Sequence, residues 1–496
     1  MSFLTGDRSY IPQSLTSSAQ KRDERHAMKE YDIIIIGSGA GANLIEDALS
    51  HNKTVALVDK GPSGGTCLNV DCIPTKMIVV PADRVMEVRE AKKLGIIAEI
   101  RAVDFSAIME RMRSHVGKSR DQIKAALEGA EDFDYYGGEA QFTDERTLEV
   151  NGKTVKGKTV FIAAGARPLV PAIKGIESVE YLTNESALRL TTLPESMVII
   201  GGGYIAAEFA HFFEAMGTRV TIVQRNKRLV PDEEPEVSEL LRSSLARRMQ
   251  LHVDMEAIEV KQTGPVVTVT AKERGSGKLR EYTASQILVA AGRKPNTDNL
   301  MVANTGVKTN EKGYIVVDEF YETSARGIWA FGDIIGKKMF RHTANAEAEL
   351  VWHNAVHGKK SRLNYLTVPH AVFSWPEIAS VGLGEAEAVK LIGKHDVLVG
   401  TAMYADVARG EAMREMEGFA KAVVHRKTGK VLGYHIIGPH ASILIQEVVN
   451  AMAADGNIWS IAKGLHIHPA LPELVLKAFG RLQPVEDGGE IIRRKP

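Results

Sequence analysis

The segment from Gly64 to Lys76 organises this chain and reads Gly-Gly-Thr-Cys-Leu-Asn-Val-Asp-Cys-Ile-Pro-Thr-Lys. It holds both cysteines of the 496-residue sequence, Cys67 and Cys72, separated by four residues. On a regular α-helix such residues have Cα atoms about 8.7 Å apart, whereas a disulfide needs less than about 7 Å. A redox-active pair therefore requires a distorted backbone, which the glycines and Pro74 permit. The alternative is two buried, reduced cysteines that act as small apolar residues.

This segment resembles the active-site segment of the FAD-dependent pyridine nucleotide–disulfide oxidoreductases. That family includes dihydrolipoyl dehydrogenase, glutathione reductase, mycothione reductase and mercuric reductase. The resemblance covers nearly the whole chain from about residue 31 to 479. It implies that Cys72 faces the flavin and Cys67 exchanges with substrate. It also implies that Lys76 lies near the flavin N5 edge, where a cation stabilises the reduced ring, and pairs with Glu208.

Asp71 departs from the family, which usually has glycine at this position. If the glycine is needed for a positive φ, aspartate tolerates that conformation better than most residues. An ionised carboxylate close to the cysteines disfavours their thiolates and raises the thiol pKa. We therefore expect the substitution Asp71→Gly to fold normally and to lower the thiol pKa.

The overall composition excludes several classes of function. Sixty-two basic residues balance 62 acidic ones, so nothing global indicates nucleic acid or an anionic membrane as a partner. No apolar stretch reaches 18 residues, so no membrane span is expected. Two cysteines in so long a chain fit a reducing compartment, and the sequence shows no signal peptide. We expect a cytoplasmic protein without a metal site.

A first dinucleotide-binding unit begins at the apolar run Ile33–Ile36. The next residues, from Gly37 through Gly39 to Ala42, fit the pattern G-x-G-x-x-G/A that opens a helix. The predicted second strand, Val55–Val58, ends at Asp59, 22 residues after Gly37. An acid there can bind the adenosine ribose while the helix N-terminus binds the pyrophosphate.

A second unit repeats this pattern between Met197 and Val223. A strand over 197–200 leads into Gly201, Gly203 and Ala206, then a helix over 204–216 and a strand over 219–223 that ends at Gln224. Two such units imply two nucleotides, one held and one exchanged. The residue after the second strand is neutral Gln224, followed by the basic stretch from Arg225 to Arg228, where NAD sites usually have an acid. This favours NADP over NAD, with Arg225 as the leading contact.

Further segments match the family's cofactor and acid–base motifs. The resemblance assigns FAD contacts to Gly37, Gly39, Ala42, Asp59, Lys60, Thr66, Lys76, Gly138, Ala164, Gly165 and Asp333. It assigns NAD(P) contacts to Gly201, Gly203, Ala206, Gln224, Arg225 and Gly292. Near the C-terminus, the pattern His-Pro-x-x-x-Glu matches the family, and the resemblance implies that His468 is an acid–base group whose tautomer Glu473 fixes. In the family this histidine comes from the partner subunit, so a homodimer is implied.

The predicted fold class is α/β, with two Rossmann-like domains and a C-terminal α+β dimerisation domain. The expected division is an N-terminal extension over 1–29, an FAD-binding domain over 30–175 and 297–363, an NAD(P)-binding domain over 176–296, an interface domain over 364–483, and a tail over 484–496. The alternating patterns after about Asn364 indicate the interface domain.

The predicted function is electron exchange between NAD(P)H, FAD, the cysteine pair and a small dithiol or disulfide. Dihydrolipoyl dehydrogenase is the default for a member with only two cysteines, because mercuric reductase and the high-molecular-weight thioredoxin reductases carry a further C-terminal redox pair. The alternative is an NADPH-dependent mycothione reductase or a similar reductase of a low-molecular-weight disulfide, which the predicted NADP preference favours. A non-catalytic flavoprotein subunit is a more remote alternative, against which the intact cysteine pair, Lys76, His468 and Glu473 argue.

Overall fold

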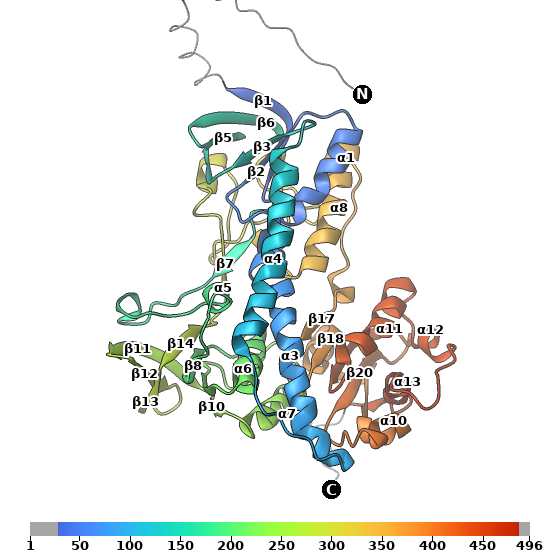
Figure 1. Ribbon diagram of the computed structural model, residues 1–496. Coiled ribbons are helices and arrows are strands. Elements are labelled where there is room, and N and C mark those ends of the chain that lie inside the picture. Colours follow the sequence, from blue (N-terminus) through green and yellow to red (C-terminus); the bar gives the residue numbers. More distant parts are fainter. Residues whose placement is uncertain (1–27, 486–496) are drawn as a thin grey trace, which may run out of the picture.

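The computed structural model describes residues 28–485 (Figure 1). The predicted extension and tail lie outside these residues, apart from Met28, Lys29, Pro484 and Val485. Lys29 already belongs to the first strand, so the fold begins one residue before the predicted boundary.

The first sheet is built around strand β1 (Lys29–Ile36), which pairs in parallel with β2 (Val55–Asp59) and β6 (Lys153–Ile162). The order along the sheet is β3-β2-β1-β6-β5-β4. Ile34 and Ile35 are fully buried, as expected for a parallel strand covered on both faces. The remaining strands are β3 (Asp134–Gly137), β4 (Ala140–Asp144) and β5 (Thr147–Val150).

The chain leaves this domain and later returns to it. Strand β16 (Ile328–Ala330) pairs in parallel with β6. Helix α8 (Arg341–His357) then packs beside the turn Ala40–Asn43 and α1 (Leu44–Ser50). Residues far apart in the sequence thus build one domain, and we propose the predicted division of the FAD-binding domain into two parts on this ground.

Two long helices connect the domains. Helix α3 (Cys72–Glu90) and helix α4 (Phe105–Glu128) lie side by side and descend from the first sheet towards the other two domains (Figure 1). Met109 and Met112 of α4 are buried in the same apolar cluster as residues of α3 and α6 (Tyr204–Met216). This packing fixes α3, and with it Cys72, relative to the second dinucleotide-binding unit.

The second unit is a four-stranded parallel sheet in the order β10-β9-β8-β14. Its strands are β8 (Ser196–Ile200), β9 (Arg219–Val223), β10 (Gln250–His252) and β14 (Gln286–Val289). An antiparallel sheet of β11 (Met255–Thr263), β12 (Val266–Glu273) and β13 (Leu279–Ala284) packs beside it. Helix α6 ends at Gly217, whose φ of 114° favours glycine. Helix α7 (Pro235–Ala246) follows β9, and α5 (Asn184–Ala187) precedes β8.

A short ladder marks the junction between the first two domains. Strand β7 (Ala166–Pro168) pairs antiparallel with β15 (Arg293–Pro295). The chain crosses into the second domain after β7 and leaves it at β15. Both crossings therefore lie at one place in the molecule.

The C-terminal domain is an antiparallel six-stranded sheet in the order β17-β18-β21-β20-β19-β22 with helices packed against it. Its strands are β17 (His370–Val372), β18 (Ile378–Gly382), β19 (Val397–Met403), β20 (Phe419–His425), β21 (Val431–Ile437) and β22 (Gln483–Pro484). Its helices are α9 (Glu385–Ile392), α10 (Ala408–Ala412), α11 (Ala441–Ala454), α12 (Ile458–Ala462) and α13 (Glu473–Phe479). The predicted fold class is confirmed.

A buried lysine joins the second domain to the C-terminal domain. The Lys421 side chain is 4% exposed, and its Nζ lies 3.0 Å from Glu236 and 2.7 Å from Glu385, with Glu234 also in contact. Among residues 28–485, these three glutamates are the one group close enough together to hold a metal ion. The ammonium of Lys421 contacts all three of them.

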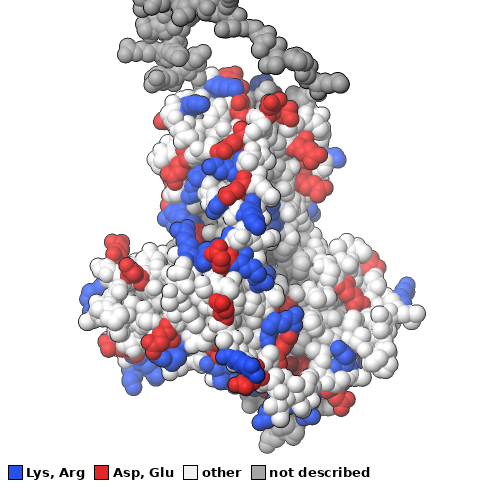
Figure 2. Space-filling view, viewed as in Figure 1, with Lys and Arg blue, Asp and Glu red and all other residues white. Residues whose placement is uncertain are grey.

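Neither sign of charge dominates the face of the molecule shown in Figure 2. Basic and acidic side chains are interspersed on the face shown in Figure 2. Within residues 28–485, every helix is too short or too polar to cross a bilayer.

We predict that Lys421→Met destabilises the protein. It leaves buried Glu234 without its cation, and breaking a buried ion pair on one side costs about 3–5 kcal/mol. Urea unfolding measures the loss, and Lys427→Met is the matched control because the Lys427 side chain is 72% exposed in its ion pair with Asp396. Equal effects of the two substitutions would contradict a structural role for the Lys421 cluster.

Candidate active site

The two cysteines lie on different helices that meet at a break in the backbone. Cys67 is in the short helix α2 (Gly65–Asn69), and Cys72 is the first residue of α3. Positive φ values of 91° at Gly64 and 73° at Gly65 turn the chain into α2. The expected distortion is therefore present. Both cysteines are half-buried free thiols that share a hydrogen bond.

The environment of the pair favours one thiolate. The hydrogen bond from Cys72 lowers the pKa of Cys67, and the charges of Arg341 and Lys76 lower it further against the opposing effects of burial and Asp71. The same hydrogen bond and burial raise the pKa of Cys72. Since only thiolates attack disulfides, Cys67 is the better nucleophile of the reduced pair.

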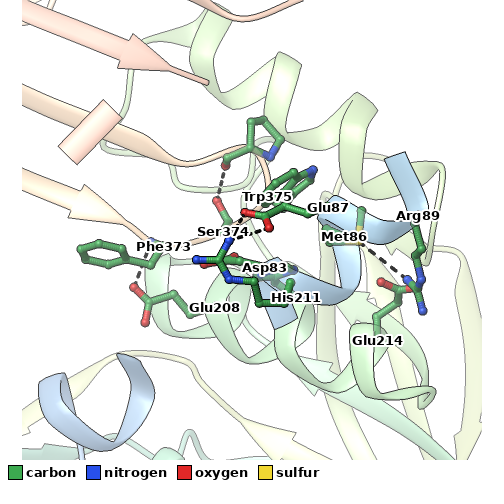
Figure 3. Close-up of polar contacts among 12 residues, drawn as sticks. Asp83, Met86, Glu87, Arg89, Glu208, His211, Glu214, Phe373, Ser374 and Trp375 are labelled. Carbon is green, nitrogen blue, oxygen red and sulfur yellow. Dashed lines mark hydrogen bonds and ion pairs between the residues drawn. The ribbon is translucent and has the colours of Figure 1, made fainter. Parts of the chain in front are cut away.

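Lys76 and Glu208 form the ion pair that the sequence suggested. The Lys76 Nζ lies 3.0 and 2.8 Å from the two carboxylate oxygens of Glu208. The backbone N–H of Phe373 donates to the same carboxylate at 3.1 Å, and Lys76 Nζ sits 4.3 Å from the centre of the Phe373 ring. Glu208 of α6 thus contacts both α3, through Lys76, and the C-terminal domain, through Phe373; Figure 3 shows the contact with Phe373.

A second contact between α3 and α6 lies beyond this pair (Figure 3). Fully buried His211, one turn after Glu208, has its Nε2 2.9 Å from Asp83 of α3. Its ring stacks on Trp375 at a centroid distance of 6.4 Å. Sequence reasoning missed this cluster, because nothing in the spacing shows that α3 packs on α6.

The cysteines open onto a cavity of about 1340 Å3 that reaches from the first sheet to the C-terminal domain. Its lining includes most of the predicted FAD contacts: Gly37, Gly39, Asp59, Lys60, Thr66, Lys76, Gly138, Ala164, Gly165 and Asp333. Cys67, Cys72 and Glu208 line it as well. Ala42 is the one predicted FAD contact that does not.

The residues present fit a dinucleotide. A Cβ on Gly37 would lie 2.4 Å from the carbonyl oxygen of Ala163, whereas one on Gly39 would meet nothing nearer than 3.8 Å, which leaves open space at the turn. The Asp59 carboxylate stands at the end of β2 and accepts N–H bonds from Ser38 and Gly61. The N-terminus of α8 also faces the cavity through Arg341, and helix N-termini favour anionic groups.

The glycines of the second unit have the predicted backbone geometry, and Gln224 and Arg225 at the end of β9 differ in exposure. Gly201 and Gly292 both have φ values of 125°, and a Cβ on Gly201 would lie 2.2 Å from the Ala290 carbonyl oxygen. Gln224 is 6% exposed, and its amide donates to the Arg228 carbonyl at 3.2 Å. Its side chain is therefore turned inward, whereas Arg225 is exposed. Gly201, Gly203, Ala206, Gln224, Arg225 and Gly292 lie outside the cavity described above.

His468 and Glu473 are bonded to each other but lie away from the cysteines of the same chain. The Nδ1 of His468 is 2.8 Å from Glu473, which also accepts the N–H of Ala470. These contacts lower the pKa of Glu473 and keep its charge beside the imidazole. The His468 side chain is 73% exposed, and neither residue lines the cavity.

The sequence matches two family descriptions. Residues 31–349 match "Pyridine nucleotide-disulphide oxidoreductase", and residues 368–479 match the dimerisation domain of the same proteins. The chain belongs to the pyridine nucleotide-disulphide oxidoreductase family. Members of this family use FAD and NAD(P)H.

Several relatives within this family share much of the chain. Mycothione reductase from Mycobacterium tuberculosis is 36% identical over 464 residues, which are 91% of this chain and 99% of the relative. Mercuric reductase from Staphylococcus aureus is 35% identical over 84% of this chain and 76% of the relative. Dihydrolipoyl dehydrogenase from Geobacillus stearothermophilus is 33% identical over 90% of this chain and 95% of the relative. The structure of an HOCl-induced flavoprotein disulfide reductase from Escherichia coli superposes with a TM-score of 0.80 and 28% sequence identity. The superposition covers 91% of this chain and 99% of that structure.

The family's glycine at position 71 is not needed for a positive φ in this oxidoreductase. The φ of Asp71 is −140°. The expectation of a positive φ was wrong, because Asp71 lies in the break before α3 and not in a left-handed turn.

We predict that Glu208→Ala destabilises the oxidoreductase. The substitution removes the acceptor of Lys76 and of the Phe373 N–H, and an unsatisfied buried donor costs about 1–3 kcal/mol. Thermal unfolding measures the effect. Glu87→Ala, which removes an exposed carboxylate from α3 near the same cluster, is the control and should leave the unfolding temperature nearly unchanged. A wild-type transition in Glu208→Ala would exclude the proposed bridging role.

Proposed function

We propose that this flavoprotein reduces a low-molecular-weight disulfide such as mycothione with electrons from NADPH. The observation that carries the proposal is the end of β9. There the acid typical of NAD sites is absent, Gln224 is turned inward, and exposed Arg225 begins a basic turn. An arginine can hold a 2′-phosphate through two parallel hydrogen bonds. The 36% identity to mycothione reductase supports the same choice.

Dihydrolipoyl dehydrogenase remains the second candidate. The chain has only two cysteines, and a relative with that name is 33% identical over 90% of the chain. Dihydrolipoyl dehydrogenases usually use NAD, so the preference for NADPH or NADH separates the two candidates. The cytoplasm is the compartment that we propose for either reaction, because few cysteines fit reducing conditions.

The chain's own residues account for the disulfide chemistry. The Cys67 thiolate attacks one sulfur of the substrate disulfide, forms a mixed disulfide and releases one thiolate. Cys72 then attacks the Cys67 sulfur and releases the second thiolate, which leaves a Cys67–Cys72 disulfide. When bound, FAD would supply the two electrons from NADPH that reduce this disulfide again. We propose that Lys76, held by Glu208, provides the positive charge beside that cofactor.

A second copy of the chain completes the proposed site. Each released thiolate needs a proton, and His468, oriented by Glu473, is suited to donate it. Within one chain this pair lies away from the cavity. Exposed apolar side chains flank it, with Leu465 fully exposed and Ile467 78% exposed. These side chains and the match to a dimerisation domain support a homodimer in which His468 of one copy serves the cysteines of the other.

We predict that the wild-type enzyme prefers NADPH over NADH and that Arg225→Ala reduces this preference. The ratio of kcat/KM for the two nucleotides is measured with mycothiol disulfide, glutathione disulfide and lipoamide, the oxidised disulfide form, as alternative substrates. Loss of one charged hydrogen-bonding partner should lower the ratio about 10-fold or more. Lys294→Ala, an exposed cation at the end of the same domain, is the control. A wild-type preference for NADH with reduction of lipoamide would favour the second candidate.

We also predict that His468→Ala slows disulfide reduction by roughly 10²–10⁴-fold, the usual contribution of a positioned acid–base group. Electron transfer from NADPH to ferricyanide does not need this proton and should persist. Equal loss of both activities would show that His468 serves assembly or folding.

A further inference from the structure

Asp71 occupies the N-cap of α3 but does not cap the helix. Aspartate at this position usually accepts the N–H of the second or third helical residue. Here the side chain makes no capping hydrogen bond. Its Oδ2 instead accepts from Nη1 of Arg293 at 3.1 Å. The carboxylate that lies between the two cysteines in sequence is thus engaged across a domain boundary.

Arg293 is a buried cation shared between two carboxylates. Its side chain is 3% exposed. Nη2 lies 3.3 Å from Asp333 and donates to the Ala166 carbonyl at 2.9 Å, while Nε has no hydrogen-bond partner among the described residues. A buried guanidinium requires compensating charge. Asp71 supplies part of it, and the glycine usual in the family has no side chain that could do so.

These contacts join three parts of the chain that are distant in sequence. Asp71 belongs to the redox segment, Arg293 lies in β15 where the chain leaves the second domain, and Asp333 lies in the returning part of the first domain. Arg293 is itself fixed, because β15 pairs with β7 and the Tyr314 hydroxyl donates to its carbonyl. The anchor of Asp71 is therefore rigid.

We propose that Asp71 is a positioning residue that ties the segment between Cys67 and Cys72 to Arg293 and so holds the two thiols towards each other. This inference rests on the proposed function only in taking these cysteines as the reactive pair. The ion pair lies at the start of α3, so its loss frees the one stretch of backbone that separates the thiols.

The ion pair between Asp71 and Arg293 also reduces the unfavourable effect of the Asp71 charge on the thiolates of Cys67 and Cys72. The hydrogen bond between Cys67 and Cys72 has the largest effect on the pKa of each thiol. The charge of Asp71 raises both pKa values, whereas the charge of Lys76 lowers them. A carboxylate next to two thiols opposes formation of the thiolate. The guanidinium of Arg293 offsets this charge, so the segment gains an anchor with less penalty on reactivity.

The test compares Asp71→Asn, which keeps the shape without the charge, with Asp71→Gly and a matched control. Glu185→Gln is that control, because Glu185 lines the same cavity and acts on Arg293 only through its field. The reduced, FAD-loaded proteins are alkylated with iodoacetamide across a pH series and followed by mass spectrometry. Hydrogen exchange of residues 66–75 is measured in parallel. The chain has two cysteines, so Cys67→Ser and Cys72→Ser assign the signals.

Both Asp71 variants should exchange residues 66–75 about 10-fold faster than wild type, because their tether is lost. Without the carboxylate, the pKa of the reactive thiol falls and the alkylation midpoint moves to lower pH. At a fixed pH below the midpoint, alkylation should be about 2- to 10-fold faster. Glu185→Gln should change neither readout.

Unchanged hydrogen exchange in Asp71→Asn would overturn the positioning role, even if the alkylation midpoint shifts. Equal shifts in Glu185→Gln would assign the effect to the general charge of the cavity and would also overturn it. Asp71→Gly restores the residue usual in the family, so a folded variant is available for comparison. Neither readout uses a disulfide substrate or a nicotinamide nucleotide. A wrong substrate assignment therefore leaves this test intact.

Discussion

The ion pair between Lys76 and Glu208 is the contact on which the arrangement of this enzyme depends. One carboxylate, 5% exposed as a residue, holds the helix that begins at Cys72, the first helix of the second nucleotide-binding unit and the backbone at Phe373. A buried charge of this kind is favourable only when its partners are placed accurately. The pair therefore requires that all three domains be assembled, and assembly in turn sets Lys76 beside the cavity.

Buried charged groups are also paired across the boundary between the second and the C-terminal domain. Buried Glu233 of the second domain contacts His370 at 2.6 Å and Ser380 at 2.6 Å in the C-terminal domain, while Lys421 contacts three glutamates. Burial opposes the charge of Glu233, but its hydrogen bond with His370 keeps its pKa low. Apolar surfaces could bring these domains together in several registers, whereas paired buried charges favour one. This specificity suits an enzyme in which electrons pass between sites on separate domains.

The Asp71–Arg293 pair and the exposed His468 show the two ways in which the site goes beyond one segment of chain. The first joins the redox segment to the end of the second domain. The second leaves the His468–Glu473 pair at the surface, and we propose that a second copy of the chain uses it as an acid–base pair. In both proposals the reactive sulfurs depend on groups that the redox segment does not contain.

Local features of this protein could be predicted from its amino-acid sequence. The spacing of glycines and apolar runs predicted β1, β9 and α6, because strand and helix periodicity and glycine-rich turns act over a few residues. The resemblance to a known family added the cavity-lining contacts and the pairing of Lys76 with Glu208. Only the tertiary structure decided that Gln224 turns inward, that His211 meets Asp83, and that Asp71 reaches Arg293. The contacts of His211 with Asp83 and of Asp71 with Arg293 depend on how helices and domains pack across more than a hundred residues of sequence, and no short-range pattern encodes that distance.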